Sequence, residues 1–409
     1  MDSKNSYSGF VSMLLGGCLP TDFDQWDLAD DQGWTLAHEA VLNGKLPTHF
    51  NQWQLADSNG FTIAHYAAQF GYLPEDFEQW TLATLKGWTV AHAIAQSSYE
   101  HKSFATTFKE WELATDDGWT VAHSAARAGR LPQGFNQWSL ANDEGLTVAH
   151  AAARVGNLPY DSQMWDLKDN DGVSVAHVAA ESGHLPDDFQ MWDLEDNDGR
   201  TVALYAARSG HLPDDFQMWD LKNHGETVAH SAAVRGHLPD DFQMWDLKNG
   251  YGKTVAHVAA ECGKLPENFE EWNLSDEQGN TVYHAAAESG CLPSGFSEWG
   301  IANKKGRTVA HVAAEHGKLP GDFKEWDLVD KQGNTVYHSA VEGDCLPKGF
   351  KKWSLANKKG WTVAHAAAKN FTLPRNFKKL DLADNRGRTV ADVIADRPDI
   401  PDFLSRKFD

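Results

Sequence analysis

The sequence has few cysteines, no long apolar run and no excess of basic charge, and each absence excludes a class of protein. Its 409 residues contain only four cysteines, at positions 18, 262, 291 and 345. This number is too small for a disulfide framework and indicates a reducing compartment. No apolar run approaches the roughly 20 residues that cross a bilayer, so no transmembrane segment is expected. The first residues lack a basic leader and a small-residue cleavage site, so no removable signal peptide is expected.

The charge is strongly acidic and unevenly distributed. The formal net charge is −22, with 36 basic and 58 acidic residues. A nucleic-acid partner needs a basic surface, so none is expected. Residues 1–250 hold 14 basic and 36 acidic residues, whereas residues 301–380 hold 15 basic and 7 acidic ones. A solvated surface explains this pattern; the alternative is two surfaces, an acidic, aromatic one and a basic one facing an acidic protein or an anionic membrane.

Motifs that carry chemistry are missing. The sequence has no Cys-x-x-Cys, no Gly-rich phosphate loop and no distinctive pairing of a nucleophile with a base. Its many Asp-x-x-Gly turns lack the alternating acidic ligands and terminal Glu of a calcium loop. We therefore predict no catalytic residue, no metal, no cofactor and no small-molecule substrate, and expect that the protein is not an enzyme.

One unit recurs along nearly the whole chain. Its consensus is G-x-T-V-A-H-x-A-A-x-x-G-x-L-P-x-x-F-x-x-W-x-L-x-D-x-x, and most copies are 27 residues apart. Fifteen copies can be counted, from Ser8 in a degenerate first copy to Thr389. Leu204 and Asp392 replace the histidine in two copies, and the histidine itself falls at positions 38, 65, 92, 123, 150, 177, 230, 257, 284, 311, 338 and 365. A repeat of this length predicts a single solenoid.

Each copy contains the signals of a short helix. Thr or Ser is a good N-cap, the V-A-H-x-A-A stretch favours a helix, and Gly is the usual residue after its end. The Leu-Pro that follows, with acidic residues and then Phe and Trp three residues apart, predicts a second short helix, as at Phe216 and Trp219. Helices this short are marginal alone, so each copy must pack against its neighbours.

The motif T-V-A-H-x-A-A-x-x-G-x-L, preceded by D-x-x-G-x, resembles the ankyrin repeat. Residues 196–201 and 206–212 carry the resemblance most closely. Val replaces the proline that the family has after Thr, and the unit has 27 residues rather than 33. The chain thus resembles a divergent, shortened ankyrin array, which implies an all-α, helix-turn-helix solenoid of about 15 stacked repeats.

The resemblance also implies a function. Ankyrin proteins are mostly non-enzymatic scaffolds for protein–protein interaction, and divergent bacterial arrays are often exported effectors that bind host proteins. We accordingly expect a monomer with a protein partner, in the cytoplasm or, for an effector, in the host cytosol. The alternative is an acidic rod that mimics nucleic acid and captures a basic protein.

The repeat pattern predicts three regions. Residues 1–34 form a degenerate N-terminal capping repeat, and residues 35–388 form the array. Residues 97–104 interrupt this array with an insertion, which is either a functional loop or a tolerated lengthening. Residues 389–409 form a C-terminal cap, because Asp392 replaces histidine and Pro398 and Pro401 stop the pattern.

The regular histidines, tryptophans and cysteines are predicted to be structural. Equivalent atoms in adjacent copies lie roughly 10 Å apart, whereas zinc requires its ligands within about 2 Å. The ankyrin resemblance implies instead that the histidines connect neighbouring turns by hydrogen bonds. Cys291 and Cys345 lie two copies apart, too far for a disulfide, so all four thiols are expected to be buried or incidental. Core packing is predicted for the F-x-x-W tryptophans, at positions 26, 53, 80, 111, 138, 165, 192, 219, 245, 272, 299, 326 and 353.

The position after the turn glycine varies, and its first six residues are apolar. They are Trp34, Phe61, Trp88, Trp119, Leu146 and Val173, and Arg200 ends the run. A continuous apolar stripe on an exposed edge is typical of an interface. These six residues are the predicted partner-binding site. The alternative is that the side chains fold back onto the turns.

Overall fold

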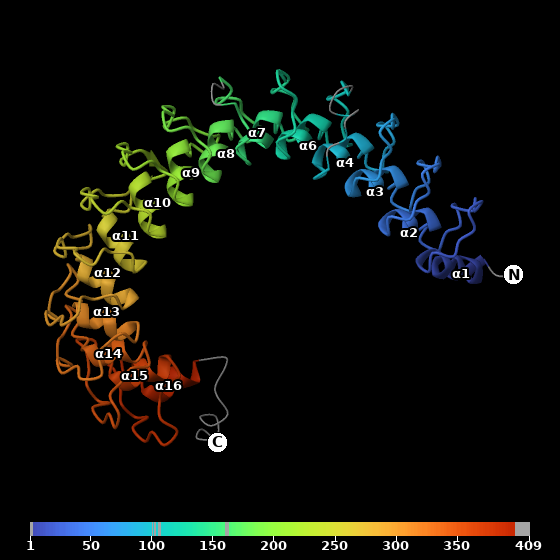
Figure 1. Ribbon diagram of the computed structural model, residues 1–409. Helices are drawn as coiled ribbons and strands as arrows, with labels where there is room; N and C mark the ends of the chain where they lie inside the picture. The colour runs from blue at the N-terminus through green and yellow to red at the C-terminus, as the bar shows by residue number, and fades with distance from the viewer. Residues whose placement is uncertain (1–2, 100, 102–103, 105–107, 160–162, 397–409) are drawn as a thin grey trace. The chain divides into compact units, whose positions relative to one another are not determined.

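The computed structural model describes residues 3–99, 101, 104, 108–159 and 163–396, and those residues form fifteen helices. The chain divides into two compact units, Met1–Pro213 and Asp214–Asp409. Within each unit the helices follow in series, and each packs against the next along the chain (Figure 1). This arrangement confirms the stacked-repeat prediction inside each unit.

The helices are short, apart from the first. The first unit contains α1 (Ser3–Leu15), α2 (Leu36–Leu42), α3 (Ile63–Phe70), α4 (Val90–Gln96), α6 (Val121–Arg127), α7 (Val148–Ala153), α8 (Val175–Ser182) and α9 (Val202–Ser209). The second contains β1 (Lys222–Asn223), β2 (Glu226–Thr227), α10 (Val228–Arg235), α11 (Val255–Glu261), α12 (Val282–Ser289), α13 (Val309–Glu315), α14 (Val336–Ala340), α15 (Val363–Lys369) and α16 (Val390–Ala395).

The helix starts are stabilised by carbonyl groups from the preceding segment. At α4 the Val90 N–H donates to the Leu82 carbonyl at 2.9 Å, and the Ala91 N–H donates to the Trp80 carbonyl at 3.0 Å. The Thr89 hydroxyl accepts the next N–H, from His92, at 3.4 Å. These bonds satisfy backbone donors that a helix leaves unpaired at its start. A seven-residue helix can therefore persist in each copy.

The second helix predicted after Leu-Pro is wrong: these segments form turns. In the segment before α11, the Phe242 N–H closes one turn onto the Pro239 carbonyl at 3.1 Å. The Trp245 carbonyl then accepts from Ala256 at 3.2 Å, at the start of the following helix. The bonds within this segment, such as Phe242 to Pro239 and Leu247 to Met244, join residues three apart, as in turns, whereas an α-helix joins residues four apart.

The first copy also differs from its prediction. Ser8 lies inside α1 and is not its N-cap, because this helix begins at Ser3, six residues earlier than the repeat indicates. Phe10 packs against Phe23 with ring centroids 5.2 Å apart, and Leu14 is buried. The Lys45 ammonium donates to the last carbonyls of α1, at Leu14 and Leu15. These contacts hold the longer helix against the next copy.

Each motif histidine connects two copies, as the resemblance implies. The Nδ1 atom of His92 accepts from the Thr89 N–H at 3.1 Å and lies 2.7 Å from its hydroxyl. The Nε2–H group donates to the Trp119 carbonyl of the next copy at 3.0 Å. A backbone donor at Nδ1 assigns the neutral Nε2–H tautomer. The contact of Nδ1 with the cap hydroxyl and the contact of Nε2 with the carbonyl of the next copy occur at all twelve positions.

Apart from the degenerate first copy, two copies lack the histidine, and they differ in what they retain. Asp392 accepts from the Thr389 N–H and hydroxyl, both at 2.7 Å, and so reproduces the contacts within its own copy. A carboxylate has no proton to donate onward, which suits the last copy. Leu204 keeps only the cap bond from its own N–H to the Thr201 hydroxyl, at 3.3 Å. The boundary between the two units follows in this copy, after Pro213.

The F-x-x-W tryptophans form the predicted core between copies. The Trp53 ring meets Phe50 of its own copy at 5.0 Å and Phe77 of the next at 5.8 Å, both edge to face. The same edge-to-face alternation recurs in the second unit, for example at Trp245. Edge-to-face contacts of this kind add to the burial of the rings.

The remaining predictions concern the cysteines, the insertion and the C-terminal cap. All four cysteines are free, but Cys18, Cys262 and Cys291 are exposed rather than buried. Within the described part of the insertion, Phe104 is buried and stacks on Phe108 at 4.5 Å, whereas Tyr99 is half exposed. The prolines of the predicted cap, Pro398 and Pro401, lie outside the described residues. No helix in the described ranges is long and apolar enough to span a membrane.

Because the motif imidazoles are buried, we expect the folded protein to lose stability in acid. Burial lowers the pKa of eleven of them below 6.5, and that of His92 to about 4. Unfolded histidine titrates near 6.5, so below that pH the unfolded chain binds more protons than the folded one. Stability should be complete above pH 6.5 and fall as the pH approaches 4. Urea unfolding followed by circular dichroism measures this, and a constant midpoint across that range would contradict it.

The alternating Phe and Trp rings form an aromatic ladder, and we expect that removing one ring from it lowers stability strongly. Trp245 is 8% exposed and contacts Phe242 and Phe269. Trp245→Ala should lower the free energy of unfolding by about 3–5 kcal/mol, because it leaves a cavity between two copies. Trp361→Ala is the control, since this half-buried ring lies outside the ladder, and it should cost clearly less. Equal losses in urea unfolding would exclude the ladder as a main source of stability.

Candidate binding groove

At the predicted stripe, hydrogen bonds hold both the backbone N–H and the backbone carbonyl. At Trp88 the N–H donates to the Thr84 hydroxyl at 3.1 Å, and the carbonyl accepts from His65 Nε2 at 2.9 Å. Gly87 precedes it with φ of 74°, a conformation that favours glycine. The stripe carbonyls of Phe61, Trp119, Leu146 and Val173 likewise accept from the histidine of the preceding copy. The fold thus uses the backbone here and leaves the side chain free to vary.

The tryptophans of the stripe fold back on one ring face only. Trp88 lies over His92 with centroids 4.8 Å apart, and Trp119 lies over His123 at 4.7 Å. Both indoles nevertheless remain half-buried, and Phe61 is 38% exposed. The two alternatives for the stripe therefore coexist: the imidazole orients each ring, and part of the ring stays accessible.

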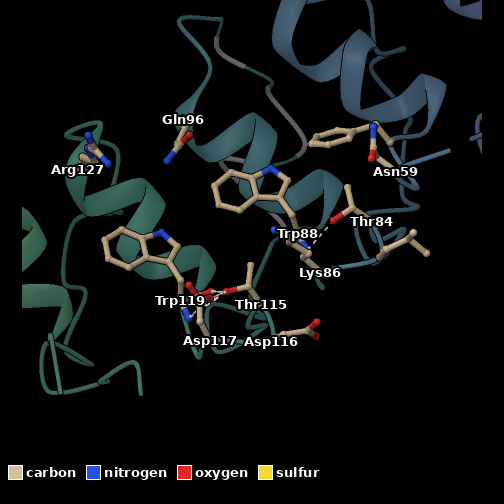
Figure 2. Close-up of a pocket in the computed structure, with 12 residues that line it drawn as sticks. Asn59, Thr84, Lys86, Trp88, Gln96, Thr115, Asp116, Asp117, Trp119 and Arg127 are labelled. Carbon is tan, nitrogen blue, oxygen red and sulfur yellow. Dashed lines mark hydrogen bonds between the residues drawn. The ribbon is translucent and has the colours of Figure 1, made fainter. Parts of the chain in front are cut away.

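Three of the predicted residues line one groove. Phe61, Trp88 and Trp119 lie along a hollow of about 1000 Å³, and Figure 2 shows the two indoles on consecutive copies projecting in the same direction. A neighbouring hollow of about 430 Å³ shares Phe61 and Trp88. Another of about 220 Å³ shares Trp119 and adds Leu146. We call this continuous surface the stripe groove.

Two predicted residues lie apart from these contacts. Trp34 stacks on His38 and meets Tyr66 edge to face, and its indole N–H donates to Glu39 at 3.3 Å. Val173 packs against the core cluster that contains Val175. The structure therefore brings together four of the six stripe residues.

The two groove tryptophans differ in their hydrogen bonds. The Trp119 indole N–H donates to the Ser124 hydroxyl at 3.0 Å. At Trp88 the equivalent helix position is Ala93, which has no acceptor side chain, and none of the described residues accepts from this indole N–H. Trp88 therefore presents a donor as well as an apolar face to the groove.

Sequence reasoning missed several groove residues. Leu85, at the tip of a turn, is 75% exposed and lines the groove. Its signal was present, because Thr84-Leu85-Lys86-Gly87 places an apolar residue where other turns carry polar ones. Gln96 and Arg127 line the groove from equivalent helix positions of successive copies, and both are exposed. Only the packed structure brings these helix positions beside the stripe.

The rim of the groove carries fixed charge. Lys86 lies on one turn, and Asp116 and Asp117 lie on the next. A hydrogen bond from Thr115 lowers the pKa of Asp117, so this carboxylate stays ionised at neutral pH. The acidic turn faces the same groove as the Arg127 guanidinium. The groove therefore offers an apolar floor between groups of both signs.

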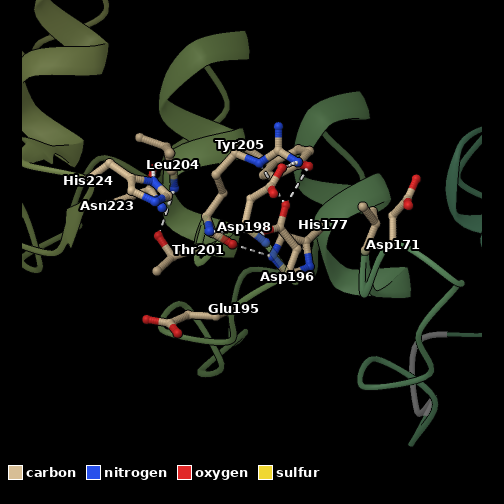
Figure 3. A network of polar contacts seen from close by, with 12 residues as sticks. Asp171, His177, Glu195, Asp196, Asp198, Thr201, Leu204, Tyr205, Asn223 and His224 are labelled. Atoms are coloured by element: carbon tan, nitrogen blue, oxygen red, sulfur yellow. Dashed lines mark hydrogen bonds and ion pairs between the residues drawn. The ribbon is translucent and has the colours of Figure 1, made fainter.

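The stripe ends at a polar network around Asp196 (Figure 3). Arg200 donates to Asp196 at 2.8 Å, and the Tyr205 hydroxyl donates to the same carboxylate at 3.1 Å. Burial alone would raise the pKa of Asp196, but these bonds and a backbone N–H outweigh it and hold the pKa below its usual value. The guanidinium lies over the turn, so the groove surface does not continue as an apolar one.

The second unit uses the same position differently. Lys253 pairs with Glu261 at 2.6 Å, Arg388 pairs with Asp396 at 2.6 Å, and Arg307 pairs with Glu315. Each basic side chain reaches the helix of its own copy. The hollow there, of about 400 Å³, is lined mainly by polar and charged groups. Among the described residues of the second unit, Trp361 is the single aromatic residue at this position, so the run of aromatic residues in successive copies belongs to the first unit.

Comparison with known proteins finds similarity among solved structures. No protein-family model matches the chain, and no curated protein matches it. Among solved structures it is similar to the ankyrin repeat domain of Bcl-3, described as a unique member of the IkappaB protein family. The identity is 22% over 42% of this chain and 97% of that one, with a TM-score of 0.30.

The class of the fold follows from the chain's own repeat. A Thr or Ser cap, a histidine that bonds to the next turn, a short helix ended by glycine and packing in series recur in phase. The protein is an ankyrin-like helical repeat protein. Within the described part of the chain, no group of three or more His, Cys, Asp or Glu side chains is placed to hold a metal ion.

Proposed function

We propose that this protein is a non-enzymatic scaffold that binds a segment of another protein in the stripe groove. The observation that carries the proposal is the pair Trp88 and Trp119. Both rings are fixed by the backbone and by a stacked imidazole, yet both line an open groove. Aromatic anchors that are ordered before binding lose little entropy when a partner covers them.

The polar groups of the groove suit a polypeptide. The Trp88 indole N–H, the Gln96 amide and the Arg127 guanidinium can donate to partner carbonyls or carboxylates. Trp88 and Gln96 belong to one copy and Arg127 to the next, so the three groups are distributed along the groove, which suits an extended segment. Exposed Leu85 adds apolar area at the rim. Burying this surface would supply the hydrophobic part of the binding energy.

Affinity capture with matched variants tests the proposal. Trp88→Ala/Trp119→Ala should weaken cross-linking and capture of a partner by roughly tenfold or more, because anchor residues dominate interfaces. Trp361→Ala is the control, since this ring stacks on His365 in the same way but lies in the second unit. If the double variant captured every partner as well as the wild type does, the groove would not be the binding site.

A second candidate is an acidic mimic of nucleic acid that captures a basic protein. Successive turn tips of the first unit support it, since Asp116, Asp117, Asp143 and Glu144 are all exposed. Salt separates the two functions. Capture through the groove should change little between about 50 and about 500 mM NaCl, whereas mimicry should lose at least roughly tenfold in affinity. Binding measured by surface plasmon resonance across this range decides between them.

The place of action belongs to the proposal as well. An exported bacterial effector would meet its partner in the host cytosol, and a retained scaffold would meet it in the cytoplasm of the producing cell. The acidic charge and the ankyrin-like array are compatible with both. Fractionation of cells that produce a tagged chain distinguishes them.

A further inference from the structure

The turn tips change sign along the chain. The two residues before the turn glycine are Asp116-Asp117 and Asp143-Glu144 in the first unit, but Lys304-Lys305 and Lys358-Lys359 in the second. Lys331 and Arg386 belong to the same set of tips, and all six basic residues are exposed. The backbone of these turns is equivalent in both units. The sign of the charge is therefore a property of the sequence that the fold does not require.

The basic side chains are held in a row. The ammonium of Lys331 donates to the Lys304 carbonyl at 2.7 Å, and that of Lys358 donates to the Lys331 carbonyl at 2.8 Å. Lys304 makes the same contact with Glu277 at 2.7 Å. Each of these ammonium groups keeps two further protons for a ligand. Lys305 and Lys359 have no ion-pair partner among the described residues, so their charges are also available.

The backbone beneath the row is ordered too. The Lys331 N–H donates to the Lys305 carbonyl at 3.1 Å, and the Asn385 N–H donates to the Lys359 carbonyl at 3.0 Å. These bonds join each tip to the tip before it. The charges therefore project from a continuous edge with a regular spacing, instead of from independent loops.

We propose that this edge binds a short acidic segment of a partner polypeptide that runs along the tips. We call it the basic tip row and define it as Lys304, Lys305, Lys331, Lys358, Lys359 and Arg386. It is separate from the stripe groove and does not depend on the function proposed there. The row lies in residues 301–387, in a part of the chain with an excess of basic residues, which attracts an acidic chain.

The spacing of the tips sets the length of the partner segment. Adjacent copies are separated by roughly 10 Å, and an extended chain advances about 3.3 Å per residue. A carboxylate at every third residue would therefore meet one tip. Four tips accommodate a segment of roughly ten residues.

A polypeptide fits this edge better than a nucleic acid or a membrane. The net charge of −22 repels a long polyanion, whereas a short segment contacts only the basic stretch. Among the residues that directly follow the glycines of these tips, Trp361 is the single aromatic one and stacks on His365, whereas single-stranded nucleic acids rely on a series of stacking platforms. Asp330 and Asp384 remain at the base of two tips, bonded to backbone N–H groups, and reduce the attraction for phosphates.

The test uses the full chain and a labelled peptide of roughly ten residues with Glu at every third position. Fluorescence anisotropy should show saturable binding that weakens as NaCl rises from about 50 to about 300 mM. Lys305→Glu/Lys359→Glu should weaken it by roughly tenfold or more. Lys378→Glu/Lys379→Glu makes the same charge change on an exposed loop outside the row and should have a clearly smaller effect.

Other outcomes would overturn the assignment. Equal losses in the two Lys→Glu pairs would show attraction to net charge instead of to the row. Tighter binding of single-stranded DNA or of phosphatidylserine vesicles in the same assay would assign another ligand. Self-association in sedimentation velocity that Lys305→Glu/Lys359→Glu abolishes, without peptide binding, would assign a second copy. Circular dichroism confirms that each variant is folded.

A further variant separates this site from the stripe groove. Trp88→Ala/Trp119→Ala should leave binding of the acidic peptide unchanged, because the groove lies in the first unit and the row in the second. Loss of peptide binding in this variant would contradict the separation of the two surfaces. Loss of partner capture with retained peptide binding would support both sites independently.

Discussion

The structure depends on one hydrogen-bonded side chain, the imidazole that joins twelve of the fifteen copies to the copy that follows. Its Nδ1 accepts from the cap residue of its own helix, and its Nε2–H donates to the carbonyl of the following turn, as His92 does between Thr89 and Trp119. Helices of five to eight residues would be marginal alone. Because the same ring stabilises a helix start and fixes the next turn, local structure and stacking form together.

Because the backbone makes these contacts, stacking does not require a particular side chain at the residue after the turn glycine. The residue after the turn glycine provides a carbonyl for the imidazole and an N–H for the turn, so its side chain can be aromatic, aliphatic or basic. In the first unit the choice of Trp88 and Trp119 creates an oriented apolar groove. In the second, Lys253 and Arg388 reach carboxylates on their own helices, and a polar surface results. A uniform scaffold thus carries surfaces of different chemistry.

The charge of the turn tips also varies while their backbone stays the same. A backbone hydrogen bond joins the tip of one copy to the tip of the next, as from Asp143 to Asp117 and from Lys331 to Lys305. These bonds do not depend on the sign of the side-chain charge. Acidic tips accompany the stripe groove, and basic tips form a separate edge in the second unit. The protein can therefore meet an apolar segment and an acidic segment on different parts of its chain, each with its own dependence on salt.

The amino-acid sequence by itself determined the repeat, the start of most helices, the bridging histidines and the F-x-x-W core, because these signals recur in phase and act between near neighbours. Only the tertiary structure decided what depends on contacts between segments. The segment before α11 forms i to i+3 turns instead of the predicted second helix, and the carbonyl of Trp245 bonds to the start of α11. Of the stripe, Trp34 turned to Tyr66 and Val173 to the core, while Leu85 and Gln96 joined the groove. The physical reason is that a pattern specifies which backbone groups pair, whereas a surface is defined by side chains that meet only after the copies have stacked.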